Sequence, residues 1–543
     1  MAVNPIKTPF TNMSFTPDVP SSALSDKEYN AGYNIVTNVR SVQSVQGEEY
    51  ILSTIPGNII YVTSGFRNAS VFWFVVATVQ GRWYAINNAG YTDVTPTVSA
   101  YKNTYTVNTV ITASWNGSVL FINDELNPPM FLLPTATQIY LYDNPPYNYV
   151  WNYDVGVNSS GNTVPLYSSL TAGFLRVYNS PNVGSLLIAG NLTGNINANV
   201  VPSGGTVQSL PTTIRWSQNF GLNSGPTTWA PTLTNVANEV EIPVRGPVID
   251  GFSLSGNFYL FSYWDCVLMA PIAYTSTSAP VFGISKVTDG RGLINENCWA
   301  IVDQTAYGID SSDIWMFNGG QFKEIGNQRV KNFFFGSINP AYTNQIFMVN
   351  NTYINQIEIY YPDQDSTGRC NQMISYRYDL DIWNPPRQVA LATAGCESPV
   401  WTANVPNLSS RGVVYSSYAG NVALIQKDVG NAFIGNTTIS SLFKRDNISF
   451  GQPYSASVQV HRVYPEIYGT GNIDVTVGGS QSVAGNVLYK TTQTMPIVTD
   501  NPWVQINQNE ARVTSIQLSA NSNVDSWELS AVNWQVTLVQ NTR

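Results

Sequence analysis

Charged side chains are scarce in this sequence: Asp, Glu, Lys and Arg make up 11% of its 543 residues, against roughly 25% in an ordinary soluble domain. The 34 acidic residues outnumber the 25 basic ones, which gives a net charge of -9. Such a chain repels phosphate at long range, so ordinary nucleic-acid binding is not expected. A hydrophobic share of 43% and an aromatic share of 12% exclude disorder for most of the chain.

Histidine and cysteine are also rare. The single histidine, His461, lies in an alternating stretch with no nucleophile elbow nearby, so Ser-His-Asp catalysis and histidine-based zinc sites are not expected. We predict a structural role for His461. The cysteines are far apart and form no Cys-x-x-Cys pair, which favours buried free thiols over metal ligands or disulfides. They are Cys266, Cys298, Cys370 and Cys396.

Long apolar runs are missing too. The longest, residues 71–79, is about half the length that a membrane helix needs and is rich in β-forming residues. It predicts a buried strand, and no membrane-spanning segment is expected. The first ten residues contain one lysine and no apolar core, so they do not resemble a secretory signal.

What recurs throughout is a short β pattern, in which a turn former, usually Gly, precedes a strand of about four apolar and aromatic residues. Helical periodicity is hard to find. Eight copies begin at Gly57, Gly81, Gly117, Gly184, Gly256, Ser312, Asn355 and Gly420. From Gly81 onward their spacing scatters around the roughly 40–50 residues of a four-stranded propeller blade, and the pair at 57 and 81 fits one blade. The pattern predicts an all-β fold, a β-propeller of six or seven blades.

The predicted propeller occupies residues 46–450. A chain of β-sandwich modules is the rival architecture, but it requires linkers that are hard to find. Residues 1–45 are rich in Pro, Ser, Asn and Thr and predict an N-terminal arm that packs on a neighbour. Residues 451–543 alternate clearly and predict a small C-terminal β domain. The Pro, Asn and Tyr-rich stretch at 134–167 predicts an exposed insertion.

Paired carboxylates are the remaining route to enzymatic chemistry, because glycosidases need only two acids at a suitable separation. Asp250, Asp265, Asp303 and Glu358 lie in or beside apolar strands, but turn and rim positions explain them equally well. Residues 363–368, Asp-Gln-Asp-Ser-Thr-Gly, resemble half of a calcium loop but lack the later bidentate Glu. A hairpin turn is the favoured interpretation. No P-loop motif is present. We predict no catalytic residue, no cofactor and no metal site.

One region has a more specific pattern. Arg-Trp-Ser at 215–217, a Pro-containing loop and Trp-x-Pro at 229–231 resemble a recurrent segment of tail proteins from short-tailed bacteriophages. Later segments keep the order of that family. They are residues 246–251, 257–262, 290–294, 312–320, 355–362 and 376–383. The chain therefore resembles the tail nozzle proteins, also called tail tubular protein B or packaged-DNA stabilisation proteins, over roughly residues 215–385.

This resemblance implies a structural virion protein that forms the distal nozzle of a short phage tail, closes the DNA channel and allows genome ejection. The implied partners are further copies of the chain in a homohexameric ring, the head-to-tail adaptor, and tail fibres or tailspikes. Genomic double-stranded DNA would pass through without sequence-specific binding. The implied location is the virion tail, after synthesis in the host cytoplasm. The alternative is a carbohydrate-binding or glycan-degrading propeller, such as an adhesin or depolymerase.

Within the resembling region we expect Arg215, Trp216 and Trp229 to lock a long loop between strands. Arg215 should be held by a carboxylate, and both indoles should lie in the core. Burial of a large aromatic side chain is worth about 1.5–3 kcal/mol. The expected role of these residues is stability, not catalysis.

Overall fold

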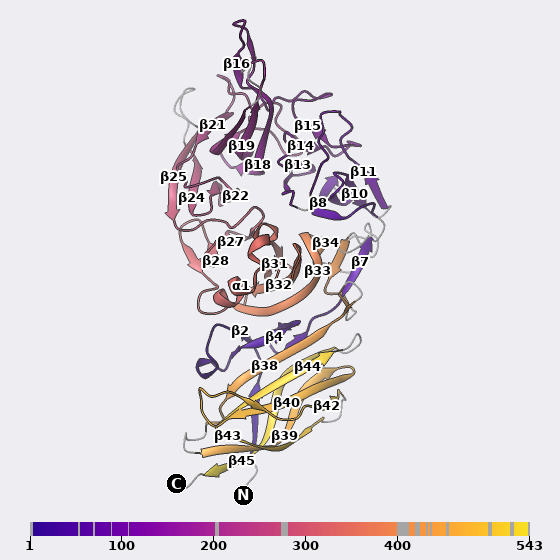
Figure 1. The fold of residues 1–543 in the computed structure, drawn as a ribbon, viewed down its shortest axis with the longest axis vertical. Coiled ribbons are helices and arrows are strands. Elements are labelled where there is room, and N and C mark those ends of the chain that lie inside the picture. The colour runs from indigo at the N-terminus through magenta and orange to yellow at the C-terminus, as the bar shows by residue number, and fades with distance from the viewer. Residues whose placement is uncertain are drawn as a thin grey trace.

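The computed structural model describes most of the chain. The described residues are 4–52, 55–68, 71–87, 90–106, 108–200, 206–272, 281–398, 412–418, 424–429, 433–434, 437–451, 456–497, 502–521 and 526–540. They form an elongated body with a propeller at one end and a β-sandwich at the other, where both chain ends lie (Figure 1).

The propeller consists of consecutive antiparallel sheets, each with neighbouring strands in chain order. Blade 1 consists of β8 (Ile59–Asn68), β9 (Val71–Thr78), β10 (Trp83–Asn87) and β11 (Gly90–Asp93). Blade 2 consists of β12 (Thr112–Asn116), β13 (Val119–Asn123), β14 (Met130–Leu132) and β15 (Tyr140–Leu141). Blade 3 consists of β18 (Tyr167–Ser180), β19 (Gly184–Ile196), β20 (Val207–Trp216) and β21 (Asn238–Glu241). Blade 4 consists of β22 (Asp250–Leu254), β23 (Asn257–Phe261), β24 (Asp265–Pro271) and β25 (Phe282–Asp289).

The second half of the ring follows the same plan. Blade 5 is β26 (Trp299–Val302), β27 (Thr305–Ile309), β28 (Ile314–Phe317) and β29 (Phe322–Glu324). A seven-stranded sheet supplies the last two blades. Its order is β30 (Phe347–Asn351), β31 (Gln356–Tyr361), β32 (Cys370–Arg377), β33 (Ile382–Ser398), β34 (Gly412–Ser417), β35 (Leu424–Lys427) and β7 (Glu48–Leu52).

The long strand β33 belongs to both of these blades. Its first half pairs with β32 and its second half with β34, so the described strands make seven blades. The ring closes because β7, from the N-terminal part of the chain, pairs with β35 as the outer strand of blade 7. Blade 7 then meets blade 1, where Thr393 Oγ1 donates to the Ile59 carbonyl at 3.1 Å.

The recurrent sequence pattern marks these blades as predicted. The copies at 57 and 81 lie in blade 1, and later copies introduce β13, β19, β23, β28 and β31. The residues Gly420–Ala423 of the last copy lie outside the described part of the chain. Gly117 and Gly256 occupy the left-handed region, at φ +61° and +79°, in the tight turns before β13 and β23. Glycine adopts this conformation without steric cost, which explains its place in the pattern.

The C-terminal domain is a sandwich of two six-stranded sheets. One contains β43 (Val504–Ala511), β39 (Ala456–Gly469), β45 (Trp527–Gln540), β6 (Val42–Ser44), β5 (Ile35–Thr37) and β1 (Asn4–Pro9). The other contains β4 (Ala31–Tyr33), β38 (Ser440–Ile448), β44 (Val513–Asn521), β40 (Asn472–Ser480), β41 (Leu488–Tyr489) and β42 (Gln493–Pro496). Alternating residues of both sheets, such as Val458, Val460, Val475 and Val477, are buried together.

The N-terminal segment differs from the predicted arm. Its strands β1, β4, β5 and β6 are part of the sandwich, and Phe10, Met13, Phe15 and Tyr29 belong to a buried cluster that also contains Trp383 of the propeller. The segment therefore packs on its own chain, because its apolar residues fill the junction between propeller and sandwich. The sandwich also begins earlier than residue 451, since β38 starts at Ser440 and pairs with β44.

The predicted insertion at 134–167 is only partly exposed. Tyr142 and Trp151 are fully buried between blades 2 and 3. The hairpin of β16 (Val155–Val157) and β17 (Thr163–Pro165) projects from the propeller end, and Val155 and Val157 are more than half exposed (Figure 1).

Short elements complete the chain. β2 (Ser14–Phe15) and β3 (Glu28–Tyr29) form a parallel pair near the sandwich, with the 3-10 helix η1 (Ser21–Ala23) between them. Helices α1 (Lys331–Ser337) and η2 (Pro340–Gln345) connect β29 to β30. β36 (Phe433–Ile434) and β37 (Thr437–Thr438) form a small hairpin.

Candidate functional site: the charged cluster at the ring closure

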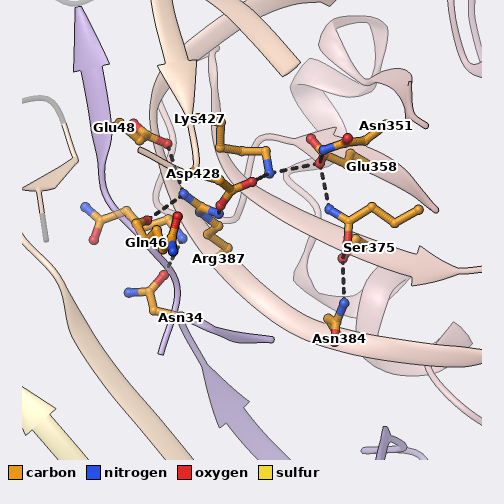
Figure 2. A network of polar contacts seen from close by, with 12 residues as sticks. Asn34, Gln46, Glu48, Asn351, Glu358, Ser375, Asn384, Arg387, Lys427 and Asp428 are labelled. Atoms are coloured by element: carbon orange, nitrogen blue, oxygen red, sulfur yellow. Dashed lines mark hydrogen bonds and ion pairs between the residues drawn. The ribbon is translucent and has the colours of Figure 1, made fainter. Parts of the chain in front are cut away.

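Four buried charged residues and the partly exposed Asp428 meet where β7 closes the ring, and Figure 2 shows their arrangement. We call Glu48, Glu358, Arg387, Lys427 and Asp428 the closing cluster. They come from β7, β31, β33 and the end of β35, and Lys427 lies directly opposite Glu48 in the strand register. Because only 11% of the residues are charged, such a concentration of buried charge is a distinctive feature of this chain.

The ion pairs of the closing cluster form a continuous series from Glu358 to Glu48. Lys427 Nζ lies 2.9 Å from Glu358 Oε1 and also contacts Asp428. Arg387 contacts Asp428 through Nη1, and its Nη2 donates to the Gln46 carbonyl at 3.0 Å. Glu48 is 3.8 Å from Arg387. Each cation thus bridges a carboxylate of one strand to a carboxylate or carbonyl of another.

The terminal Glu48 and the central Asp428 of this series of ion pairs respond differently to their surroundings. Burial raises the pKa of Glu48 to about 7, although Arg387 and the Tyr415 hydroxyl, which donates at 2.5 Å, act in the opposite direction. Burial also acts to raise the pKa of Asp428, but the charges of Arg387 and Lys427 outweigh it and hold that pKa below its usual value. Asp428 is therefore ionised at neutral pH, whereas Glu48 titrates near neutral pH.

Amide side chains extend the cluster toward the sandwich. Asn384 Oδ1 accepts from the Thr37 backbone N–H at 2.9 Å, and Asn34 Oδ1 accepts from that of Gln388 at 2.8 Å. Asn34 Nδ2 donates to the Ser440 carbonyl at 2.7 Å. A cavity of about 230 Å³ separates residues 36–46 from blades 6 and 7 beside this network. The arrangement joins blade to blade and propeller to sandwich. Within the cluster it leaves no pair of carboxylates free for acid–base work.

A second polar network, after the closing cluster, surrounds Arg215. The structure confirms the predicted contact of Arg215 with a carboxylate. The guanidinium donates to Glu239 Oε2 at 2.7 Å, to Asp154 Oδ2 at 2.8 Å and to the Trp151 carbonyl at 3.0 Å. Trp216 is 5% exposed, and Trp229 is fully buried with its ring 4.7 Å from that of Trp151. Arg215 thereby ties the 134–167 segment to blade 3.

The four candidate carboxylates do not form a catalytic pair. Asp250 binds Arg176 at 2.6 Å, and Asp265 lies 2.9 Å from Arg245 and 3.3 Å from Lys286. Glu358 is part of the closing cluster. Asp303 occupies the turn between β26 and β27 with φ +51°, which suits a turn residue.

The remaining candidates have structural surroundings. His461 Nε2 lies 2.8 Å from Thr537 Oγ1 within the sandwich. Asp363 Oδ1 accepts from the Asp365 N–H at 3.0 Å and from Asn371 Nδ2 at 2.7 Å, which makes residues 363–368 a hairpin turn. Cys266, Cys298 and Cys370 are buried free thiols, and Cys396 is a half-buried one. Within the described ranges no three His, Cys, Asp or Glu side chains are grouped to hold a metal ion.

Sequence reasoning found Glu358 but missed Glu48, Arg387 and Lys427. The available signal was a charge inside an apolar strand, as in Leu-Ile-Gln-Lys-Asp at 424–428. Such charges are buried only when they are paired, but the partners lie tens or hundreds of positions away along the chain.

Comparison with known proteins gives little information about this chain. No protein-family model matches the sequence, and no curated protein matches it. A solved WD40 β-propeller domain of Doa1 is similar at 9% identity, over 70% of this chain and 96% of that one, with a TM-score of 0.36. This likeness is too slight to bear on function. Among the described residues no helix has the length and apolarity that crossing a membrane requires.

Proposed function

We propose that this chain is a structural protein of a short phage tail, the distal nozzle that closes the DNA channel and opens for genome ejection. The proposal is carried by the ordered series of segments between 215 and 383 that resemble tail nozzle proteins. These segments lie on consecutive blades: β20 of blade 3, β22 and β23 of blade 4, β28 of blade 5, and β31 to β33 of blade 6. The resemblance therefore extends over four consecutive blades and is not limited to one local turn.

The construction of the body supports a mechanical role. A tail component carries load between neighbours, and here β7 and the N-terminal strands fasten the ring and the sandwich to one another. Buried ion pairs with several partners hold their geometry, because breaking one leaves an uncompensated charge. The proposed partners are five further copies in a hexameric ring, the head-to-tail adaptor, and tail fibres or tailspikes.

The net charge supports a channel through which DNA slides without being tightly bound. A surface that neutralised many phosphates would bind DNA tightly and oppose sliding. A chain with net charge -9 does not hold a passing duplex in this way. In the proposed role no residue is catalytic.

Assembly with the adaptor provides a direct test. We expect the purified chain, mixed with the adaptor complex of the same particle, to form a ring of six copies detectable by mass photometry and negative-stain microscopy. A chain that stays monomeric with its adaptor at micromolar concentration would contradict the proposal.

One feature favours the alternative, a glycan-directed propeller. Tyr263 and Trp264 are adjacent, 39% and 48% exposed, with ring centroids 5.8 Å apart. Exposed aromatic rings can stack on sugar faces. A glycan array and a reducing-end assay on host polysaccharide distinguish this alternative, because only a glycan-directed propeller would bind and lose binding in Trp264→Ala.

A further inference from the structure

The centre of the propeller contains a second cavity, of about 180 Å³, that none of the roles above uses. The innermost strands around the ring line it, with Tyr61 from β8, Arg176 from β18 and Thr393 from β33. Glu296, Asn344 and Arg369 complete its polar wall. Ligand pockets for drug-sized molecules measure roughly 300–1,000 Å³, so this cavity has the size for an ion or a very small molecule.

Arg369 is the unusual residue of this wall. It is 7% exposed and forms no ion pair with a carboxylate of the described residues. Its Nη1 donates to Gln345 Oε1 at 2.5 Å, and its guanidinium lies 4.6 Å from the Tyr418 ring centroid. Its Nη2 is buried without a hydrogen-bond partner. The neighbouring Arg176, by contrast, is neutralised by Asp250 at 2.6 Å.

A buried guanidinium without a counter-charge is costly. The charge has lost its water, and an unmade hydrogen bond adds the desolvation of the donor. Burial accordingly lowers the pKa of Arg369. Arg369 lines the cavity, so an oxyanion bound there would supply the missing counter-charge, and arginine binds sulfate or phosphate oxygens through charge-assisted hydrogen bonds.

The acidic residue of the wall does not oppose an anion at neutral pH. Burial, followed by the charge of Glu125, raises the pKa of Glu296 to about 8. Glu296 therefore carries a proton at pH 7, when it can donate a hydrogen bond. The titratable and charged groups that act on it are Glu125, Asp250 and Arg176, and Glu296 in turn acts on Tyr263 and Cys298.

We propose that the central cavity is a binding site for a small tetrahedral oxyanion, sulfate or phosphate, with Arg369 as its cationic ligand. The protonated carboxyl of Glu296 and the amide of Asn344 form the neutral part of the wall. Such a site is independent of whether the chain belongs to a virion, and it would stabilise the centre of the ring by binding the folded state alone.

Isothermal titration calorimetry with sodium sulfate at pH 7, at constant ionic strength set with sodium chloride, tests the site. We expect saturable binding of one sulfate per wild-type chain and an affinity at least tenfold weaker in Arg369→Gln. Arg82→Gln, which removes an exposed arginine paired with Asp93 outside the cavity, should bind as the wild type does. Absence of saturable binding to the wild-type chain overturns the proposal, whether or not the variant folds.

Two further experiments distinguish an anion site in the central cavity from an anion patch on the outer surface and from a purely structural arginine. Inorganic phosphate should compete with sulfate, but a short DNA duplex should not, because a cavity of about 180 Å³ is too small for a duplex. Competition by the duplex would place the anion site on the outer surface and contradict the proposal. Arg369→Gln should also melt no lower than the wild type in chloride, since it removes an uncompensated charge. A clear loss of melting temperature would instead indicate that Arg369 acts structurally.

The pH dependence provides a last check, for which sulfate is suitable because its charge is constant. Sulfate affinity should fall at least threefold between pH 7 and pH 9 as Glu296 loses its proton. In Glu125→Gln/Glu296→Gln the affinity should stay constant over the same range. An equal fall in both proteins would contradict the assigned role of Glu296.

Discussion

At the scale of single residues, the aromatic side chains of blade 3 show how much one buried ring contributes. Trp216 donates through Nε1 to the Val236 carbonyl at 2.6 Å and packs edge-on against Phe282 at 5.5 Å. Trp216→Ala should lower the free energy of unfolding by about 3–5 kcal/mol, because it leaves a cavity and a lost hydrogen bond. Trp264→Ala, which alters a half-exposed ring, should change it by less than about 0.5 kcal/mol. Equal urea midpoints for both variants would refute this account.

The closing cluster allows a second prediction at the same scale. Lys427 is 1% exposed in its side chain and Glu358 is fully buried. Lys427→Met should destabilise the fold by about 3–5 kcal/mol, because it leaves Glu358 charged and buried without its cation. Adding Glu358→Gln should recover part of this loss. A double-mutant cycle in urea measures the coupling, and strictly additive losses would mean that the two residues do not form a pair in solution.

At the scale of elements, the N-terminal strands are the ones that sequence patterns could not assign. Strands β4, β5 and β6 are three residues each. β4 pairs with β38 and β6 pairs with β45, about 400–500 positions later, and β5 joins the sheet through β6. A local sequence pattern cannot predict pairing between strands that lie so far apart in the sequence. The blade strands were predictable because each pairs with its neighbour in the chain, so a turn former and an apolar run identify them.

The placement of these strands leads to a prediction about the segment expected to be a free arm. Ile35 in β5 is 1% exposed and belongs to the cluster that joins sandwich and propeller. Ile35→Ala should cost about 2–5 kcal/mol in the isolated chain. Val39→Ala, at a position 51% exposed, is the matched control. If Ile35→Ala has no effect on unfolding until copies assemble, the segment packs on a neighbour after all.

At the scale of the whole molecule, few charges exist and many of them are internal. Burial, the largest cause in each case, raises the pKa of Glu48 to about 7 and that of Glu296 to about 8. Each carboxyl is protonated in the folded chain at a pH where its unfolded counterpart, with a pKa near 4.5, is ionised. Its stabilising contribution is therefore complete below about pH 4.5 and is lost as pH rises through 7 to 8.

This linkage predicts the direction of a pH profile. Asp428, whose pKa is lowered, keeps its full contribution above about pH 5 and does not counteract the trend. The free energy of unfolding should therefore fall from pH 5.5 to pH 8.5. Urea denaturation at fixed ionic strength measures it, and the double variant Glu48→Gln/Glu296→Gln should flatten the profile. A wild-type stability that rises over this range would contradict the assignment of these two groups.

More of the overall architecture than of the candidate site could be predicted from the sequence. Turn formers and apolar strands identified an all-β propeller, and Arg215 with Trp216 and Trp229 identified a stabilising contact of a loop between strands. Arg387, Glu48 and Arg369 escaped detection because their meaning depends on which strands meet in space.

The most direct measurement of the central proposal is immunogold electron microscopy of particles from a producing culture, with an antibody against this chain. The nozzle account predicts label at the distal end of a short tail on intact particles. Particles free of label, with the protein soluble in the lysate, would contradict it.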